Sequence, residues 1–416
     1  MTIVLFEDER TWQLAPLAMA RPAFDLLCGG MRLVHLVRQI DPKYRCLVRQ
    51  HLRDLVDADF ARAPRSSLPA DKPTLFVNAR LVPTAAVTGH LQALIAAGHT
   101  GKVVVDGQTA VAVTQTRTAE DLSQPDKLAA WLDSQSLAAL KVELALFAYP
   151  HDLVARHLQI TSDNLQHLVA GGEYRQDQDG VFLAGDARIG PYVVTDTQAG
   201  PIVLEPGVTI GSHCYLRGPI HLGEETVVVE QSSIKGPLAA GRQTKLGGEI
   251  TASIIDSYSN TAHHGFLGHS CLGSWVNFGA GTTNSNLKNT YGEIHVEYEG
   301  HKVATGMQFL GCMVGDYAKT AINTAIFTGK TLGVASMLYG TVTANVPAFV
   351  NYAGGLGRAT EVSVEAALKM QARMFSRRGR TARGCDAHVL QAVYQQTGDA
   401  RRRWDPELDM GPPVFR

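Results

Sequence analysis

One apolar residue recurs at every sixth position in the stretch LEPGVTIGSHCYLRGPIHLGEETVVVEQSSIKGPLAAGRQTKLGGEITA, which covers residues 204–252. The residues in this register are Leu204, Ile210, Leu216, Leu222, Val228, Ile234, Ala240, Leu246 and Ala252. Glycine repeatedly follows the apolar position, and small or apolar residues such as Val208, Cys214 and Thr226 recur four places after it. A short strand with a tight, glycine-tolerant turn every six residues folds a chain into a triangular coil. The stretch therefore predicts a left-handed parallel β-helix.

The same register returns in two later runs. They consist of Phe266, Leu272 and Phe278, and then of Val314, Thr320, Ile326, Leu332 and Leu338. Two interruptions, residues 253–265 and roughly 284–309, separate the runs. Departures from a repeat usually become loops on one face of a β-helix, often its binding face. We therefore expect the functional site at these interruptions.

The residues before the repeats have a different pattern, in which short apolar runs alternate with helical stretches. The expected strands are Ile3–Phe6, Leu75–Val77 and Val103–Val105, and the expected helices cover residues 30–39 and 85–97. Asp106-Gly107 is expected to form a hairpin turn after the third strand. This alternation is typical of an α/β domain, which we expect to cover residues 1–185.

Helical spacing returns after the repeats. Val364, Leu368 and Phe375 share one helical face, and Asp386 is expected to cap a second helix. The basic residues between them are Arg373, Arg377, Arg378, Arg380 and Arg383. We favour a solvated helix face and loop for them over contact with the phosphates of a ligand. The chain is thus expected to have a β-helix over residues 186–350 and a helical extension over 351–416.

Composition narrows the classes of function. The chain has 416 residues, and 38 Lys and Arg against 39 Asp and Glu give a formal charge of -1. No global field attracts nucleic acid or an anionic membrane, so a small molecule or a protein partner is expected. No signal-peptide pattern and no run of eighteen apolar residues occurs, which favours a cytoplasmic location. The six cysteines lack C-x-x-C spacing and are expected to be buried, reduced thiols.

Polar residues with useful chemistry gather in two segments. Residues 258–268 read YSNTAHHGFLG, and residues 277–286 read NFGAGTTNSN. They resemble the acetyltransferase half of the bacterial bifunctional enzymes that acetylate glucosamine-1-phosphate and then uridylylate the product. In that family a histidine precedes Tyr-Leu-Gly by three residues, and Asn-Ile-Gly-Ala-Gly-Thr follows. His263 stands at the histidine position, Phe266 at the tyrosine position, and Asn277 begins the second motif.

The resemblance implies acyl transfer from acetyl-CoA to an amino sugar or sugar phosphate, in nucleotide-sugar biosynthesis. It implies that His263 removes a proton from the attacking amine and that the N–H of Ala280 stabilises the oxyanion. The implied substrate-binding residues are Phe266, Asn277, Asn286 and Lys288. The fold leads us to expect a homotrimer.

A divergent branch of these bifunctional proteins is more similar still, with motifs at residues 247–250, 284–289 and 315–320. Two departures from the acetyltransferase pattern remove fixed positive charge. Thr251 stands where a lysine holds the sugar phosphate, and Ala344 stands where an arginine holds a CoA phosphate. The cations that can replace them are Lys235, Lys245, Lys288, Lys330 and the C-terminal arginines.

Residues 14–30 resemble the opening of a sugar-nucleotide pyrophosphorylase, in which a glycine-rich loop wraps the nucleotide phosphates. Here the loop, residues 6–13, is acidic and has no glycine, and Ala23 stands at the position of the lysine. Asn78-Ala79-Arg80 replaces the metal-binding Gly-Asp. The residues that would meet a nucleotide are Arg10, Arg21, Asn78 and Arg80. We favour a structural or allosteric remnant over nucleotidyl transfer, and expect Mg²⁺ only with an active domain.

Two alternatives stay open. The five histidines at positions 213, 221, 263, 264 and 269 suggest a γ-carbonic-anhydrase-like hydratase, although their spacing does not clearly match its metal ligands, and we expect no metal site. The other alternative is a non-catalytic scaffold whose β-helix forms a trimer. A scaffold would bind no acyl-CoA.

Overall fold

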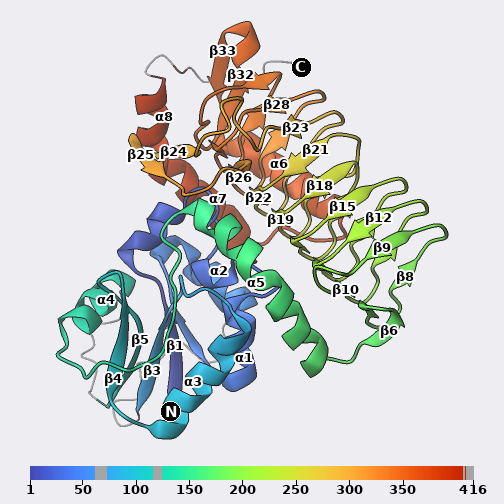
Figure 1. Ribbon diagram of the computed structural model, residues 1–416. Helices are drawn as coiled ribbons and strands as arrows, with labels where there is room; N and C mark the ends of the chain where they lie inside the picture. Colours follow the sequence, from blue (N-terminus) through green and yellow to red (C-terminus); the bar gives the residue numbers. More distant parts are fainter. Residues whose placement is uncertain (61–72, 116–123, 406–407, 409–416) are drawn as a thin grey trace.

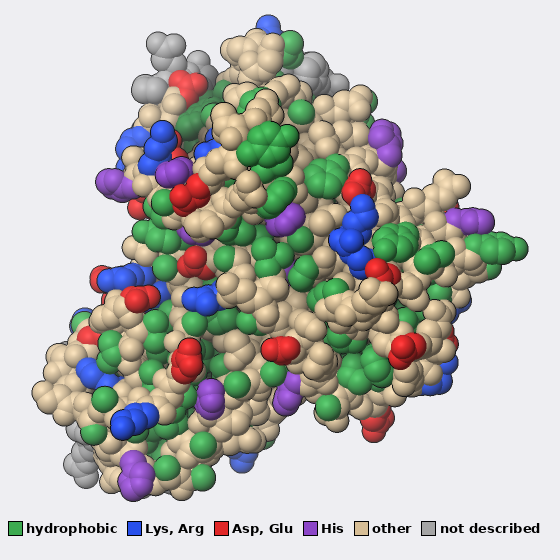
Figure 2. All heavy atoms as spheres, viewed as in Figure 1, with side chains coloured by type: hydrophobic (Ala, Val, Ile, Leu, Met, Phe, Trp, Pro, Cys, Tyr) green, Lys and Arg blue, Asp and Glu red, His purple; other side chains and the backbone are tan. Residues whose placement is uncertain are grey.

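The computed structural model describes residues 1–60, 73–115, 124–405 and 408. Figure 1 shows an N-terminal α/β domain packed against the side of a long β-helix, with C-terminal helices between the two. The expected order of α/β domain, parallel β-helix and C-terminal helices is confirmed. Basic and acidic side chains are interspersed over the face drawn in Figure 2, as the near-zero net charge suggests.

The N-terminal domain is built on one sheet in the order β2–β1–β3–β5–β4. Its strands are β1 (Thr2–Phe6), β2 (Arg45–Leu47), β3 (Thr74–Asn78), β4 (Gly101–Val105) and β5 (Gln108–Thr114). Its helices are α1 (Leu33–Ile40), α2 (Arg53–Asp59), α3 (Ala85–Ala97), α4 (Pro125–Ser134) and α5 (Pro150–Gly171), with 3₁₀ turns η1 (Glu9–Leu14), η2 (Ala23–Asp25) and η3 (Gln50–Leu52). The first three strands are parallel, and β5 runs antiparallel to β3.

The four residues of β1 that follow Thr2 are apolar and buried, and they point alternately to the two faces of the sheet. Ile3 and Leu5 lie in the large core shared with α1 and α3, whereas Val4 and Phe6 lie in a smaller core beneath α4. That alternation is the two-residue period of a strand. The predicted hairpin turn is also confirmed, since Asp106 and Gly107 both have positive φ between β4 and β5.

The β-helix has three faces. The first face holds β6 (Arg175–Gln178), β7 (Val181–Leu183), β10 (Ile202–Leu204), β13 (Ile220–Leu222), β16 (Leu238–Ala240), β19 (Ile254–Ile255), β22 (Cys271–Leu272), β26 (Cys312–Val314) and β29 (Lys330–Leu332). The second holds β8 (Arg188–Ile189), β11 (Thr209–Ile210), β14 (Val227–Val228), β17 (Lys245–Leu246) and β20 (Asn260–Thr261) and, beyond Asn277, β27 (Lys319–Thr320), β30 (Met337–Leu338), β32 (Val350–Ala353) and β33 (Arg358–Glu361). The third holds β9 (Val194–Asp196), β12 (Tyr215–Arg217), β15 (Ser233–Lys235), β18 (Glu249–Thr251), β21 (Phe266–Gly268), β23 (Thr283–Asn284), β28 (Ala325–Ile326) and β31 (Thr341–Val342).

The six-residue register is confirmed from Leu204 to Leu246, since all eight of these residues belong to the buried core of the coil. Ala252 is a wrong prediction, because Ile250 lies opposite Ile234 and takes the inward position. Eighteen residues separate Leu216 from Ile234, but sixteen separate Ile234 from Ile250. The shorter coil leaves Ala252 in a turn with a positive φ of 50°.

Phe266 is also wrong as an inward residue, because Leu267 pairs with Ile250 and fills the core. The first expected interruption, residues 253–265, is not a loop, since β19 and β20 continue the coil through it. The second interruption is confirmed. Between β23 and β26 the chain leaves the coil in an excursion, residues 285–311. The excursion contains an antiparallel hairpin of β24 (His295–Tyr298) and β25 (His301–Ala304).

The sheet pairing also bears on the domain boundaries. The strands β6 and β7 belong to the first face although they precede residue 186. At the other end, β32 continues the second face beyond residue 350, and the short turn η5 (Gly354–Leu356) joins it to β33. The β-helix therefore extends to both sides of the expected range.

Three helices follow the β-helix, namely α6 (Val364–Arg377), α7 (Gly384–Gln396) and α8 (Gly398–Trp404). Asp386 caps α7 as predicted, but from the third helical position: its carboxylate accepts a hydrogen bond from the N–H of Arg383, the N-cap residue, at 2.8 Å. Phe375 of α6 stacks on Trp275 of the β-helix with ring centroids 4.5 Å apart. The C-terminal helices thus help to join the two larger domains.

The α/β domain and the β-helix share one apolar core. Residues of the first face, including Ala239, Ile254 and Met313, are buried together with those of the N-terminal sheet. All six cysteines are free thiols, but Cys46 and Cys385 are only half-buried, so the expectation of burial is wrong for these two. Among the described helices, none is both long and apolar enough to cross a membrane.

Candidate active site

The segments around His263 and Ala280 lie on neighbouring coils, at the corner between the second and third faces. The Gly281 N–H donates to the His264 carbonyl at 2.9 Å, and the Phe278 N–H donates to the Asn260 carbonyl at 2.8 Å. The strand β21, which follows His263, pairs with β23, which follows Ala280. The structure therefore brings the two sequence motifs together, beside the labelled strands β21 and β23 of Figure 1.

Glycine makes this close stacking possible. Gly265 has a φ of 150°, and a Cβ atom there would lie 2.1 Å from the Thr282 carbonyl oxygen. Gly281 has a φ of 76°, and its Cβ atom would lie 2.1 Å from the Asn323 side chain. Both positions have a backbone conformation that favours glycine, and at Gly265 the neighbouring backbone also leaves no space for a side chain.

His263 and Ala280 keep hydrogen-bonding capacity. His263 is exposed, and its imidazole makes no hydrogen bond or ion pair within the described residues. The Ala280 carbonyl accepts from the Asn323 N–H at 2.7 Å, whereas the Ala280 N–H donates to no acceptor in the described ranges. An imidazole that can accept a proton and an N–H that can bind an oxyanion are the groups that acyl transfer needs. His264, beside His263, is exposed in the same way.

A second cluster lies on the third face and contains Phe266 and Asn286, two of the predicted substrate-binding residues. A Cβ atom on Gly268 would lie 2.6 Å from both side chains, so they flank this glycine together. The Asn286 amide nitrogen lies 2.9 Å from Nδ1 of His269, whose ring stacks on Phe309. Burial lowers the pKa of His269. The sequence indicated His269 only as a candidate metal ligand. Its contacts with Asn286 and Phe309 could not be predicted, because both partners lie in the excursion.

The other two expected substrate-binding residues lie apart from the corner. The Asn277 side chain accepts a hydrogen bond from Asn260 at 2.8 Å, within the ladder of the second face. Lys288 lies in the excursion, and its ammonium group donates to the Glu293 carbonyl. Lys235 lies directly opposite Thr251, on the preceding coil of the third face. Its ammonium group is 2.7 Å from Glu249. A cation is therefore present beside the position of the missing lysine.

At the carboxyl edge of the N-terminal sheet, acidic and basic side chains pair with one another. Arg80 contacts both oxygens of Asp8, at 2.9 and 2.6 Å, and Asn78 donates to Asp8 at 2.8 Å. Burial acts to raise the pKa of Asp8, but the hydrogen bond and charge of Arg80 outweigh it and lower that pKa. Glu7 pairs in the same way with Arg49 at 2.9 Å. These four charged groups are nearly inaccessible.

The two other arginines expected at a nucleotide behave differently. Arg21 turns toward the β-helix and binds Asp256 at 2.5 Å and Asp316 at 2.6 Å, and all three side chains are buried. Arg10 is exposed. Because guanidinium groups hold the carboxylates of Glu7 and Asp8, these residues do not fit a Mg²⁺ site. Within the described ranges, no three His, Cys, Asp or Glu side chains lie close enough to hold a metal ion.

Known proteins resemble separate parts of the chain. A family model described as sugar nucleotidyl transferase matches residues 3–171. The bifunctional sugar-1-phosphate nucleotidylyltransferase/acetyltransferase of Sulfurisphaera tokodaii is 28% identical over 34% of this chain and 35% of its own length. The bifunctional protein GlmU of Alkalilimnicola ehrlichii is 30% identical over 42% of this chain and 38% of its own length. The chain thus spans little more than a third of the length of these two relatives.

Two solved structures align with about half of the chain. LpxA from Acinetobacter baumannii has 14% identity and a TM-score of 0.28, and the alignment covers 54% of this chain and 91% of that one. The UDP-N-acetylglucosamine acyltransferase of Francisella novicida has 15% identity and a TM-score of 0.26, with 57% and 92% covered. Residues 3–171 therefore match the sugar nucleotidyl transferase family model, a parallel β-helix follows them, and the chain is similar to bifunctional sugar nucleotidylyltransferase/acetyltransferases.

Proposed function

We propose that the β-helix transfers an acyl group, most simply acetyl, from coenzyme A to the amino group of an amino sugar or its phosphate. The observation that carries the proposal is that neighbouring coils bring the segments of His263 and Ala280 together, and that neither the His263 imidazole nor the Ala280 N–H has a hydrogen-bond partner within the described residues. The similarity to bifunctional nucleotidylyltransferase/acetyltransferases supports the class of reaction.

In this mechanism the neutral imidazole of His263 accepts a proton from the attacking amine. The proton leaves as the amine nitrogen forms its bond to the thioester carbonyl carbon, and the Ala280 N–H donates to the developing oxyanion. When the tetrahedral intermediate collapses, the carbon–sulfur bond breaks and the thiolate of coenzyme A leaves. The imidazolium returns its proton to the sulfur, which leaves an amide and a free thiol.

The remaining residues bind the acceptor. Phe266 and Asn286 flank Gly268 on the third face and would contact the sugar, with His269 holding the Asn286 amide. Lys235 would supply the positive charge that Thr251 lacks, since the two residues are paired across neighbouring coils. The corner is open on the single chain, which is consistent with a homotrimer whose neighbouring copy would complete the coenzyme site.

For the N-terminal domain we propose a structural role without nucleotidyl transfer. The buried pairs Glu7–Arg49 and Asp8–Arg80 support it, because these four charged groups already neutralise one another and are not free to hold phosphate or a metal ion.

The test is an assay of thiol release from acetyl-CoA with amino-sugar phosphates as acceptors. His263→Ala should abolish most of the release, while the matched variant His264→Ala keeps it. Thiol release that survives in His263→Ala would refute the assignment of the base. Wild-type protein that releases no thiol with any amino sugar would leave the scaffold as the better account.

A further inference from the structure

A cleft of about 1100 Å³ lies where the N-terminal domain, the β-helix and the C-terminal helices meet. The residues that matter for its chemistry are Arg32, Arg38, Asp256, Tyr258, Arg380 and Arg383. Tyr258 precedes the short strand β20 and His263 follows it, so the two residues lie at different corners of the coil. The cleft is therefore separate from the proposed acyl-transfer site.

The floor of the cleft is a buried network of charges. Arg21 and Arg32 both bind Asp256, each at 2.5 Å, and Arg21 also binds Asp316 at 2.6 Å. Arg32 lies 3.4 Å from Asp25 as well. These contacts join the N-terminal domain to the β-helix and fix the side chains at the floor, so a ligand would meet a preorganised polar surface.

Most charged groups in the cleft are paired. Arg383 binds Asp59 at 2.5 Å and Asp386 at 2.9 Å. The remaining acidic groups of the lining, Glu205 and Glu224, lie 3.1 Å from His221 and 3.3 Å from Arg242. His35, the other histidine of the lining, lies on α1.

Two arginines remain without a carboxylate partner within the described residues. Arg38 on α1 and Arg380 after α6 are exposed and line the cleft from opposite domains. Arg380 lies over the Tyr258 ring, 5.1 Å from its centroid, and donates to the Tyr258 hydroxyl. The two exposed arginines therefore offer positive charge to a ligand. The floor does not, because its two arginines face the three carboxylates of Asp25, Asp256 and Asp316.

An aromatic wall stands beside these arginines. The rings of Tyr258 and Trp275 stack with centroids 4.3 Å apart and an interplanar angle of 10°. Phe375 of α6 covers the other side of Trp275. Packing fixes the orientation of Tyr258: Trp275 covers one face of its ring and Arg380 lies over the other, so a ligand would meet the ring edge and the hydroxyl group.

We propose that this cleft binds a phosphorylated sugar, either free or as the ribose phosphate of a nucleotide. Arg38 and Arg380 would hold the phosphate by charge-assisted hydrogen bonds. The hydroxyl group and ring edge of Tyr258 would contact the sugar, and the hydroxyl groups of the ligand would meet the polar floor. Because the site touches all three parts of the chain, such a ligand would also hold the two large domains together.

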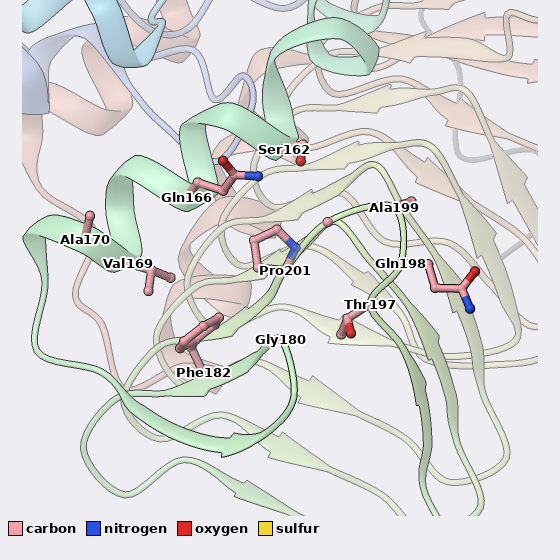
Figure 3. A pocket seen from close by; sticks show the side chains of 11 residues that line it. Ser162, Gln166, Val169, Ala170, Gly180, Phe182, Thr197, Gln198, Ala199 and Pro201 are labelled. Carbon is pink, nitrogen blue, oxygen red and sulfur yellow. The ribbon is translucent and has the colours of Figure 1, made fainter.

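A second hollow serves as a contrast. It has a volume of about 520 Å³ and lies between α5 and the first coils, and none of the residues that line it is charged. Figure 3 shows Gln166 of α5 facing Pro201, with Phe182 beneath them. A phosphorylated ligand would find no cation there, so the chemistry points to the larger cleft.

The experiment is a calorimetric titration of the full chain with glucose-1-phosphate, with uridine monophosphate and with glucose. Wild-type protein should bind at least one phosphorylated probe and no glucose. Arg380→Gln should weaken that binding at least tenfold. The matched control is Arg377→Gln, an exposed arginine near the end of α6 that does not line the cleft. It should change the affinity less than twofold.

The two phosphorylated probes distinguish a free sugar phosphate from a nucleotide. His263→Ala should bind the probes like wild type, which separates this cleft from the acyl-transfer corner. The proposal is overturned if neither phosphorylated probe binds at millimolar concentration. It is equally overturned if Arg380→Gln binds like wild type, or if the loss appears in His263→Ala instead.

Discussion

The carboxyl edge of the N-terminal sheet and the corner of the β-helix both carry residues that resemble an enzyme site, but their polar groups are used differently. At the sheet edge, Glu7 and Asp8 are buried against Arg49 and Arg80. At the corner, the His263 imidazole and the Ala280 N–H make no hydrogen bond within the described residues. A resemblance locates a candidate site, and the hydrogen-bond partners then indicate whether its groups remain available for a substrate.

The largest expected effect is at the corner. His263→Ala should lower kcat for acyl transfer by about 10²- to 10⁴-fold, the usual contribution of general-base catalysis. His264→Ala should remain within threefold of wild type, and both proteins should unfold at the same temperature because both side chains are exposed. Equal losses in the two variants would mean that the loop conformation matters and that His263 is not the base.

The matching substitution at the sheet edge should affect stability. Arg80→Met leaves the buried Asp8 carboxylate without its partner, and breaking a buried pair costs about 3–5 kcal/mol. Urea unfolding measures this loss. The double variant Asp8→Asn, Arg80→Met should recover part of it, because no unpaired charge then remains. If Arg80→Met kept full stability and lost a nucleotide-dependent activity, the sheet edge would be a working site.

The stability of the interface between the N-terminal domain and the β-helix should depend on pH. Burial raises the pKa of Asp25 to about 6 in the folded chain, against an ordinary value of 3.8. The folded state therefore binds the Asp25 proton more tightly than the unfolded state. The stabilisation from this proton is fully present below about pH 4 and is lost as the pH rises through about 6. Asp25→Asn should raise the free energy of unfolding at pH 7 by at most about 3 kcal/mol.

The measurement for Asp25 is a pair of urea titrations, at pH 4.5 and pH 7. The gain from Asp25→Asn should be smaller at pH 4.5, and the exposed control Asp177→Asn should show no such difference. A gain of the same size at both pH values would show that packing, and not the proton, is responsible.

The smallest effect concerns the acceptor. Lys235→Met should raise KM for an amino-sugar phosphate about tenfold, which corresponds to about 1.4 kcal/mol of phosphate binding. KM for the unphosphorylated amino sugar should stay unchanged. Lys245→Met, on the second face, is the control. A change in kcat without a change in KM would place Lys235 outside the phosphate site.

The periodic part of the fold could be predicted because each coil repeats the same local physics. Leu204 to Leu246 follow one register, since every inward position needs an apolar side chain. The register fails at Ala252 and Phe266 because two successive coils are short: 16 residues separate Ile234 from Ile250 and 17 separate Ile250 from Leu267, against 18 between Leu216 and Ile234. A shortened turn leaves no clear mark on composition, and inward and outward residues are both apolar there.

Contacts between distant segments could not be predicted in the same way. Arg21 binds Asp256 and Asp316, which lie 235 and 295 residues further along the chain. Its place in a motif that resembles a nucleotide-binding loop gave no hint of these partners. The cleft beside Tyr258 and Arg380 is similarly a product of packing between three parts of the chain.

The most direct test of the difference between the two regions measures both products in one reaction. Wild-type protein is incubated with acetyl-CoA, an amino-sugar phosphate, a nucleoside triphosphate and Mg²⁺, and free thiol and pyrophosphate are followed together. The free groups at the β-helix corner and the paired charges at the sheet edge predict thiol release that depends on His263, with no pyrophosphate. Pyrophosphate release without thiol release would contradict the account and assign the chemistry to the N-terminal domain.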